Sequence, residues 1–184
     1  MICLGIDQDL HNTGLALLQG FTSLDSPIVL DLDVVSVTGN DPDATVLKMI
    51  AALKAEISVF INLHKVDLCV IEGVQKYYGT SPAKVEDLIR GAYISGAAAA
   101  YCWQQNPECF CIVNPNEWKG SIPKNIHQER LYNFLGWKPK RIKSHSYPKE
   151  PPEEFKFSSE EWKHIGDGIG LAWWGLRRKL EGRI

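Results

Sequence analysis

Ile2-Cys3-Leu4-Gly5-Ile6-Asp7 opens the chain as a short apolar run that ends in an acid. A turn-rich stretch covers residues 9–14, and the apolar pattern resumes from Gly14 to Leu18. Two apolar runs joined by a short turn predict a β-hairpin, rather than a strand that leads into a helix. The hairpin therefore decides the start of the fold and sets Asp7 at the end of its first strand.

The rest of the chain alternates between predicted strands and helices. After the hairpin, the apolar patterns predict strands over 28–37, 66–71 and 109–113. Helices are predicted from the cap at Asn40-Asp41-Pro42-Asp43 to Phe60, and over 83–103, 125–135 and 158–180. Residues 137–157 carry four prolines and many lysines, which predicts an exposed basic loop. This order predicts an α/β domain, with a mixed sheet of about five strands and helices on both faces.

Length and composition restrict the classes of protein to which this chain could belong. With 184 residues, 45% hydrophobic and 23% charged, the chain fits one globular domain. Apolar runs are too short to cross a membrane, and the N-terminus lacks the basic start of a signal peptide. The five cysteines are odd in number and two lie in apolar strands, which favours free buried thiols over a disulfide framework or a zinc site. We expect a cytoplasmic protein that is not secreted.

Three acids and one histidine stand out by position. Asp7 and Glu72 each end a predicted strand, at the edge of the sheet where open α/β folds keep their sites. Asp167 is flanked by glycines in the last helix, so its charge needs a close partner if it is buried. His164 precedes Asp167 by three residues and shares its helix face. Asp7 or Glu72 alone has an ordinary alternative as a cap or a solvated strand end, but a metal ion shared with both would give Asp167 the partner that it needs.

The ligand types indicate which metal such a site would hold. Carboxylates with one imidazole suit Mg²⁺ or Mn²⁺ better than zinc, because these ions prefer oxygen ligands. Two such ions about 4 Å apart activate water and stabilise the leaving oxygen in phosphodiester hydrolysis.

Five segments resemble, in chain order, the motifs of RuvC-type Holliday junction resolvases, which belong to the ribonuclease-H-like superfamily. They are Leu4-Gly5-Ile6-Asp7-Gln8-Asp9 with Thr13-Gly14, Val70-Ile71-Glu72, Gly91 with the small-residue helix after it, Asn114-Pro115 with Trp118-Lys119-Gly120, and His164-Ile165-Gly166-Asp167. Together they span nearly the whole chain.

The resemblance implies a ribonuclease-H-like sheet in a single nuclease domain over residues 1–184. It implies a metal-dependent, structure-selective DNA endonuclease that cuts four-way junctions as a homodimer. Asp7, Glu72 and Asp167 would be the carboxylate ligands of two Mg²⁺ ions, for which Mn²⁺ substitutes. Asp7 would bridge both ions, and His164 would be the fourth catalytic and metal-binding residue.

The sequence departs from the family pattern where DNA would bind. Gln75 stands where family members often carry an aromatic residue, and Tyr77 and Tyr78 follow as candidates to stack on bases. The loop at 137–157 is longer than in compact bacterial members, and the basic segment after Lys119 is shorter. These departures leave open the sequence preference and the strictness for four-way junctions.

The net charge of −2 averages over two opposed regions. Residues 1–117 hold 6 basic and 14 acidic residues, a net −8, whereas residues 118–149 hold 8 and 1, a net +7. A basic segment is often only solvated surface, but beside an acidic metal site it favours phosphate binding. The predicted DNA-binding side chains in this segment are Lys119, Lys124, Arg130, Lys138, Lys140, Arg141 and Lys143.

Two further segments have open interpretations. The small-residue stretch from Gly91 to Ala100 fits close packing against the sheet or a helix contact with a second subunit. The cluster Arg177-Arg178-Lys179 with Arg183 fits DNA binding or a helix C-terminus favoured by the dipole.

Three alternative functions remain beside the junction resolvase. A related nuclease of the same superfamily would act on other branched DNA or on structured RNA. The Gly-Ile-Asp…Thr-Gly start also resembles the first phosphate motif of actin-like ATPases, but those folds repeat the motif and no second copy is present here. A non-catalytic DNA-binding relative would not need four residues of this kind.

Overall fold

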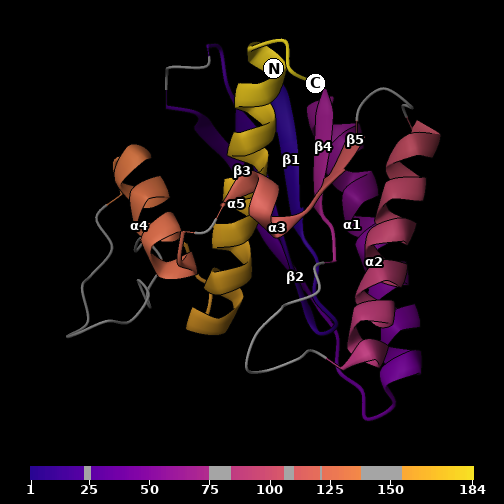
Figure 1. Cartoon of the computed structure of the whole chain (residues 1–184). Coiled ribbons are helices and arrows are strands. Elements are labelled where there is room, and N and C mark those ends of the chain that lie inside the picture. The colour runs from indigo at the N-terminus through magenta and orange to yellow at the C-terminus, as the bar shows by residue number, and fades with distance from the viewer. Residues whose placement is uncertain (23–25, 75–83, 106–109, 121, 138–154) are drawn as a thin grey trace.

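A five-stranded mixed sheet forms the centre of the protein in this computed structural model, which describes residues 1–22, 26–74, 84–105, 110–120, 122–137 and 155–184 (Figure 1). The strands are β1 (Ile2–Asp7), β2 (Asn12–Gln19), β3 (Ile28–Ser36), β4 (Leu68–Glu72) and β5 (Phe110–Val113). Their order across the sheet is β3-β2-β1-β4-β5. The first three strands are antiparallel neighbours, and β4 and β5 run parallel to β1.

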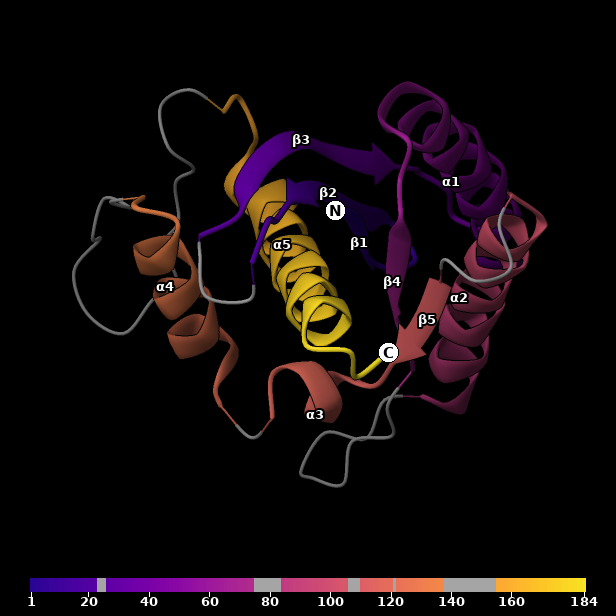
Figure 2. The ribbon, with the colours of Figure 1, turned by 90° about the horizontal axis from the view of Figure 1, so that it is seen from above.

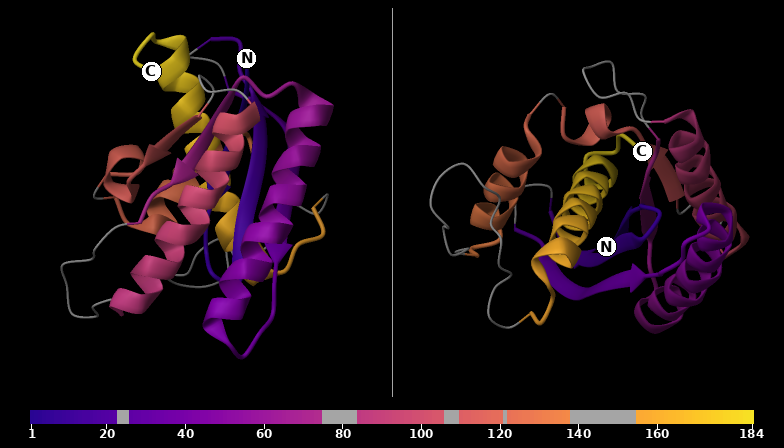
Figure 3. Two further views of the ribbon diagram at one scale, coloured as in Figure 1. Left: turned by 90° about the vertical axis from the view of Figure 1, so that its right-hand side faces the viewer. Right: turned by 90° about the horizontal axis from the view of Figure 1, so that it is seen from below.

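Helices cover both faces of the sheet, as the sequence predicted. They are α1 (Pro42–His64), α2 (Val85–Gln105), α3 (Pro115–Trp118), α4 (Lys124–Phe134) and α5 (Ser159–Leu180). Seen from above, α1 and α2 lie on one side of the strands and α5 on the other, with α4 outside α5 (Figure 2). The views from the side and from below show α1 and α2 packed together (Figure 3). None of the described helices is long and apolar enough to cross a membrane.

The predicted caps account for where the long helices begin. The Asp41 side chain accepts a hydrogen bond from the backbone N–H of Asp43, and Pro42 occupies the first turn of α1. Ser158 and Glu161 form a capping box at the start of α5. The hairpin is confirmed, with Asp7 of β1 opposite Gly14 of β2.

Alternation along the strands assigns each side chain to one face. Leu4 and Ile6 of β1 pack on the side of α1 and α2, whereas Cys3 packs on the side of α5. In β4, Val70 likewise faces α5. Asp7 and Glu72 follow Cys3 and Val70 at even spacing, so both acids belong to the α5 face.

Glycine on the hairpin lets α5 approach the backbone of the sheet closely. A Cβ on Gly5 would overlap the carbonyl oxygen of Gly168, and a Cβ on Gly14 would overlap the backbone at His164. A larger residue at either position would push the helix away from the strands. This close approach fixes the distance between the polar residues of α5 and the strand ends.

Two expectations need correction. The short helix α3 was not predicted from the sequence, although the Glu117 carboxylate accepts a hydrogen bond from the backbone N–H of Asn114 at its start, at 2.7 Å. The segment 137–157 was predicted to be an exposed loop, but its two ends are half-buried. The ring centroids of Trp137 and Phe155 lie 5.4 Å apart, and both rings pack against Trp162 of α5. Burial of large aromatic side chains stabilises the fold, which outweighs the exposure expected from the neighbouring prolines and lysines. Residues 138–154 lie outside the described part of the chain.

Substitution of Gly5 by Ala tests the close approach of α5. We expect Gly5→Ala to lower the free energy of unfolding by about 3 kcal/mol or more, because the new methyl group meets backbone that cannot rotate away. Denaturant unfolding measures the loss. Gly20→Ala is the matched control, since its methyl group would meet only side-chain methyl groups, those of Leu176 at 3.3 Å and Leu180 at 3.6 Å, and no backbone. A loss for Gly5→Ala no larger than that of the control would contradict the account.

Candidate active site

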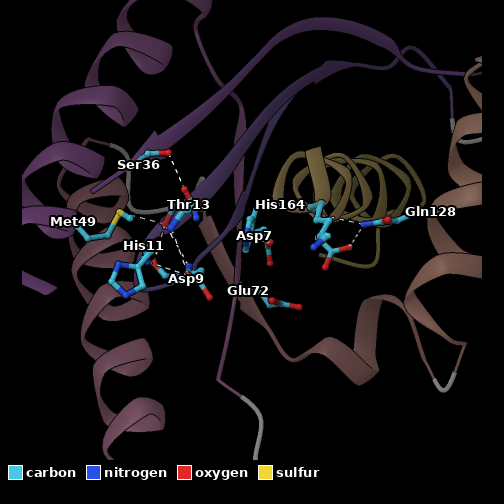
Figure 4. A network of polar contacts seen from close by, with 12 residues as sticks. Asp7, Asp9, His11, Thr13, Ser36, Met49, Glu72, Gln128 and His164 are labelled. Atoms are coloured by element: carbon cyan, nitrogen blue, oxygen red, sulfur yellow. Dashed lines mark hydrogen bonds and ion pairs between the residues drawn. The ribbon is translucent and has the colours of Figure 1, made fainter. Parts of the chain in front are cut away.

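Two strand ends bring Asp7 and Glu72 together. Ile6 pairs with Ile71 across the parallel β1–β4 ladder, so the next residue of each strand is an acid at the same edge. Asp7 is 4% exposed, and the side chain of Glu72 is 12% exposed. Figure 4 shows the two carboxyl groups at this edge of the sheet, beside α5.

Helix α5 adds His164 and Asp167 to the same place. The Nδ1 atom of His164 lies 3.1 Å from Oδ2 of Asp7, which is a hydrogen-bond distance (Figure 4). Asp167 lies one turn further along and is only 2% exposed. The four residues selected from the sequence thus meet at one edge of the sheet, and Asp7 directly contacts His164.

Lys119 links the acid of β4 to the acid of α5. Its Nζ atom lies 3.5 Å from Oε1 of Glu72 and 3.9 Å from Oδ2 of Asp167. The side chain of Lys119 is only 16% exposed. Lys119 was predicted from the sequence to contact phosphate, and the structure places its ammonium group within the acidic site.

Two more side chains hold the acids, and neither was predicted from the sequence as a site residue. The Trp118 Nε1 donates a hydrogen bond to Oε1 of Glu72 at 3.1 Å. The Gln128 Nε2 donates to Oδ1 of Asp167 at 2.9 Å. The signal for Gln128 was its helical spacing with Leu131 and Tyr132, which predicts that a polar side chain occupies the buried face of α4.

Burial sets the protonation of Glu72. Loss of hydration raises the pKa of Glu72 from 4.5 to about 9, and the charge of Asp7 and a hydrogen bond with its carboxyl group add to the rise. The ammonium group of Lys119 acts in the opposite direction. A second positive charge at this edge would favour the ionised form of Glu72.

The donor types at this edge fit a hard divalent cation. Three carboxyl groups and one imidazole provide the oxygen-rich set that Mg²⁺ and Mn²⁺ prefer. Among the described residues, however, no three His, Cys, Asp or Glu side chains are already arranged around a common ion position. Instead, His164 contacts Asp7, and Lys119 lies between Glu72 and Asp167. Metal binding would therefore require these side chains to exchange partners.

The predicted DNA contacts are only partly described. Arg130 is exposed on α4, while for Lys124 the structure describes the backbone alone. The remaining candidates lie outside the described residues: Tyr77, Tyr78, Lys138, Lys140, Arg141 and Lys143.

The basic cluster near the end of α5 has partners of its own. Arg177 lies over the ring of Trp173, and Arg178 lies over the ring of Trp174. Arg177 also forms an ion pair with Glu181.

The raised pKa of Glu72 predicts a specific pH dependence of stability. In the unfolded chain this carboxyl group ionises near pH 4.5, but in the folded protein it holds its proton to about pH 9. The contribution of Glu72 to the free energy of unfolding is therefore fully present below pH 4.5 and is lost as the pH rises toward 9.

We expect the stability of Glu72→Gln relative to the wild type to rise with pH. Without metal, the difference in the free energy of unfolding should shift in favour of the variant by about 1–3 kcal/mol between pH 5 and pH 8. Denaturant unfolding in EDTA measures it. A difference that stays constant over this range would show that Glu72 ionises normally.

Comparison with known proteins identifies solved structures of similar fold. No protein-family model and no curated protein matches the sequence. Among solved structures, T. thermophilus RuvC in complex with a Holliday junction substrate is similar, with a TM-score of 0.69, 16% identity, and coverage of 100% of this chain and 98% of that chain.

Two further structures share the similarity. Another structure of Thermus thermophilus RuvC gives a TM-score of 0.65 at 16% identity, covering 99% of this chain and 97% of that chain. The yeast mitochondrial Holliday junction resolvase Ydc2 gives a TM-score of 0.52 at 10% identity, covering 99% of this chain and 86% of that chain. This chain therefore has the ribonuclease-H-like fold of the RuvC-type Holliday junction resolvases.

Proposed function

We propose that this protein is a metal-dependent, structure-selective DNA endonuclease that cuts four-way junctions. The observation that carries the proposal is the meeting of Asp7, Glu72, His164 and Asp167 at one edge of a RuvC-like sheet. One similar structure, T. thermophilus RuvC, is in complex with a Holliday junction substrate. A single nuclease domain over residues 1–184, in the cytoplasm, is part of the proposal.

The reaction would be hydrolysis of a phosphodiester bond. Two Mg²⁺ ions, held by Asp7, Glu72, His164 and Asp167, would supply Lewis-acid stabilisation of the attacking and leaving oxygens, and Mn²⁺ would substitute. After its contact with Asp7 is exchanged, His164 would orient the attacking water or accept its proton. Lys119 provides a positive charge within the site that favours an approaching phosphate group.

Related substrates form the second candidate function. The same acids would serve hydrolysis of flaps, other branched DNA or structured RNA, because the chemistry at phosphorus is shared. Cleavage rates on a four-way junction, a flap, a duplex and a structured RNA rank these substrates. Thermal stabilisation by ATP would instead revive the actin-like ATPase hypothesis.

A homodimer would place two such sites on one junction, and α2 offers a surface for it. An uncharged stripe follows one face of this helix and stays exposed, although several of its members are large apolar residues. Its members are Val85, Ile89, Ala92, Tyr93, Gly96, Ala100 and Trp103. Ser95, Ala98 and Ala99 face the other way, into the core. The small residues of α2 therefore fall into two sets. The buried set packs toward the sheet, and the exposed set would allow two α2 helices to approach closely.

Asp7→Asn tests the proposed catalysis. We expect this variant to lose cleavage of a four-way junction in Mg²⁺ by at least about 100-fold, because the amide cannot replace the anionic ligand. Its affinity for the junction should stay within about threefold, because binding depends mainly on basic side chains. Gel assays of cleavage and of binding in Ca²⁺ measure the two properties.

Asp9→Asn is the matched control for this test. Asp9 lies two residues away and accepts a hydrogen bond from the backbone N–H of His11 at 3.0 Å, which an Asn oxygen also accepts. The control should cut like the wild type. Undiminished cleavage by Asp7→Asn would refute the proposed function.

Gly96→Arg tests the homodimer. We expect the wild type to have twice the mass of the 20.7 kDa chain by light scattering, and the variant to have the mass of one chain. A charged side chain in the middle of the stripe leaves its guanidinium group without a partner in an apolar contact. Ala51→Arg, on the exposed side of α1, is the control and should remain dimeric. A wild type that stays monomeric at high concentration would exclude this interface.

A further inference from the structure

The amide of Gln128 connects α4 to two groups on α5. Its Nε2 atom donates to Oδ1 of Asp167 at 2.9 Å and to the backbone carbonyl of Lys163 at 3.1 Å (Figure 4). Gln128 is 2% exposed, so no bulk water competes for these bonds. An amide nitrogen has two hydrogens, and this geometry uses one for each acceptor.

Such a bond restricts the rotation of the Asp167 carboxyl group. The terminal torsion of an aspartate is broad and nearly two-fold, so the side chain alone does not select which oxygen faces the site. With Oδ1 bonded to Gln128, the other oxygen, Oδ2, is the one that lies 3.9 Å from the ammonium group of Lys119. Gln128 thus determines which oxygen Asp167 presents to the other site residues.

The sequence of α5 makes room for this contact. A Cβ on Gly166 would lie 2.9 Å from Nε2 of Gln128 and would overlap the hydroxyl group of Tyr132. Glycine at this position therefore allows α4 to approach α5 closely enough for the amide to reach Asp167. The second bond, to Lys163, ties the amide to the backbone of the same helix that carries the acid.

We propose that Gln128 is a positioning residue that orients Asp167 for divalent-metal binding and phosphodiester cleavage. The inference rests on the proposed function, since Asp167 is one of the proposed ligands. Gln128 does not touch the substrate or the ion; it acts through the carboxyl group that it holds. Partners of this kind typically change metal affinity or activity by about 10–100-fold when removed.

Gln128→Met tests the inference, because methionine has a similar length and volume but no donor. We expect Mn²⁺ affinity of the DNA-free protein, measured by calorimetry, or kcat on a four-way junction to fall by about 10–100-fold. The KM for the junction should change less than about threefold, because the DNA-binding surface is untouched. A purely structural role would lower the melting temperature without this split between kcat and KM.

Tyr132→Phe is the matched control. Tyr132 lies one turn after Gln128 and also meets Gly166, but its buried hydroxyl group has no hydrogen-bond partner among the described residues. The variant should keep wild-type Mn²⁺ affinity and kcat. If Gln128→Met does not fold, Gln128→Leu also fills most of the space and lacks the donor, so it should show the same loss.

Two outcomes would overturn the proposal. One is Mn²⁺ affinity and kcat of the Gln128 variant within threefold of the wild type; the other is an equal loss in Tyr132→Phe. A wild type that binds Mn²⁺ but cuts no junction would refute the proposed function, and the Mn²⁺ affinities would still test the role of Gln128.

Discussion

The close approach of α5 to the hairpin determines where every residue of the candidate site lies. The helix rests almost directly on the backbone of β1 and β2, because glycines stand at the points of contact. Gly14 lies against the backbone at His164, and Gly5 lies against Gly168, so the contacts flank Asp167 along the helix. A helix held further away would leave its His and Asp out of reach of the strand that ends in Asp7.

The same packing buries carboxyl groups whose ionisation costs free energy. Burying acids from three elements at one edge raises the free energy of the ionised state, which appears as the raised pKa of Glu72. Lys119 offsets part of this cost from the segment after α3, and neutral donors from Trp118 and Gln128 bind two of the carboxyl groups. The donor types and the excess of acid match a site that binds divalent cations.

Most of the fold was predictable from local patterns. The hairpin, the caps of α1 and α5, and the positions of Asp7 and Glu72 at strand ends all follow from short-range rules of turn chemistry and alternation. His164 and Asp167 were also identified from the sequence, by their spacing and by the glycines around the acid. These features depend on residues close together in the chain, so one sequence contains the necessary information.

The remaining features depend on contacts between distant segments. Gln128 lies 39 positions from Asp167, and Trp118 lies 46 positions from Glu72, so no local pattern pairs them. The ends of the 137–157 segment were predicted to be exposed from its prolines and lysines, but Trp137 and Phe155 find a common partner in Trp162. In each case the tertiary packing against α5 decides the outcome.

A crystal soaked in Mn²⁺ tests most directly whether this edge of the sheet is a nuclease site. Anomalous scattering locates the ion without assumptions about its ligands. The account predicts a peak bounded by Asp7, Glu72 and Asp167, with His164 beside it, and with the ammonium group of Lys119 displaced from its place between the two acids. A fully soaked crystal with no peak at this edge, or with Mn²⁺ bound only elsewhere, would contradict it.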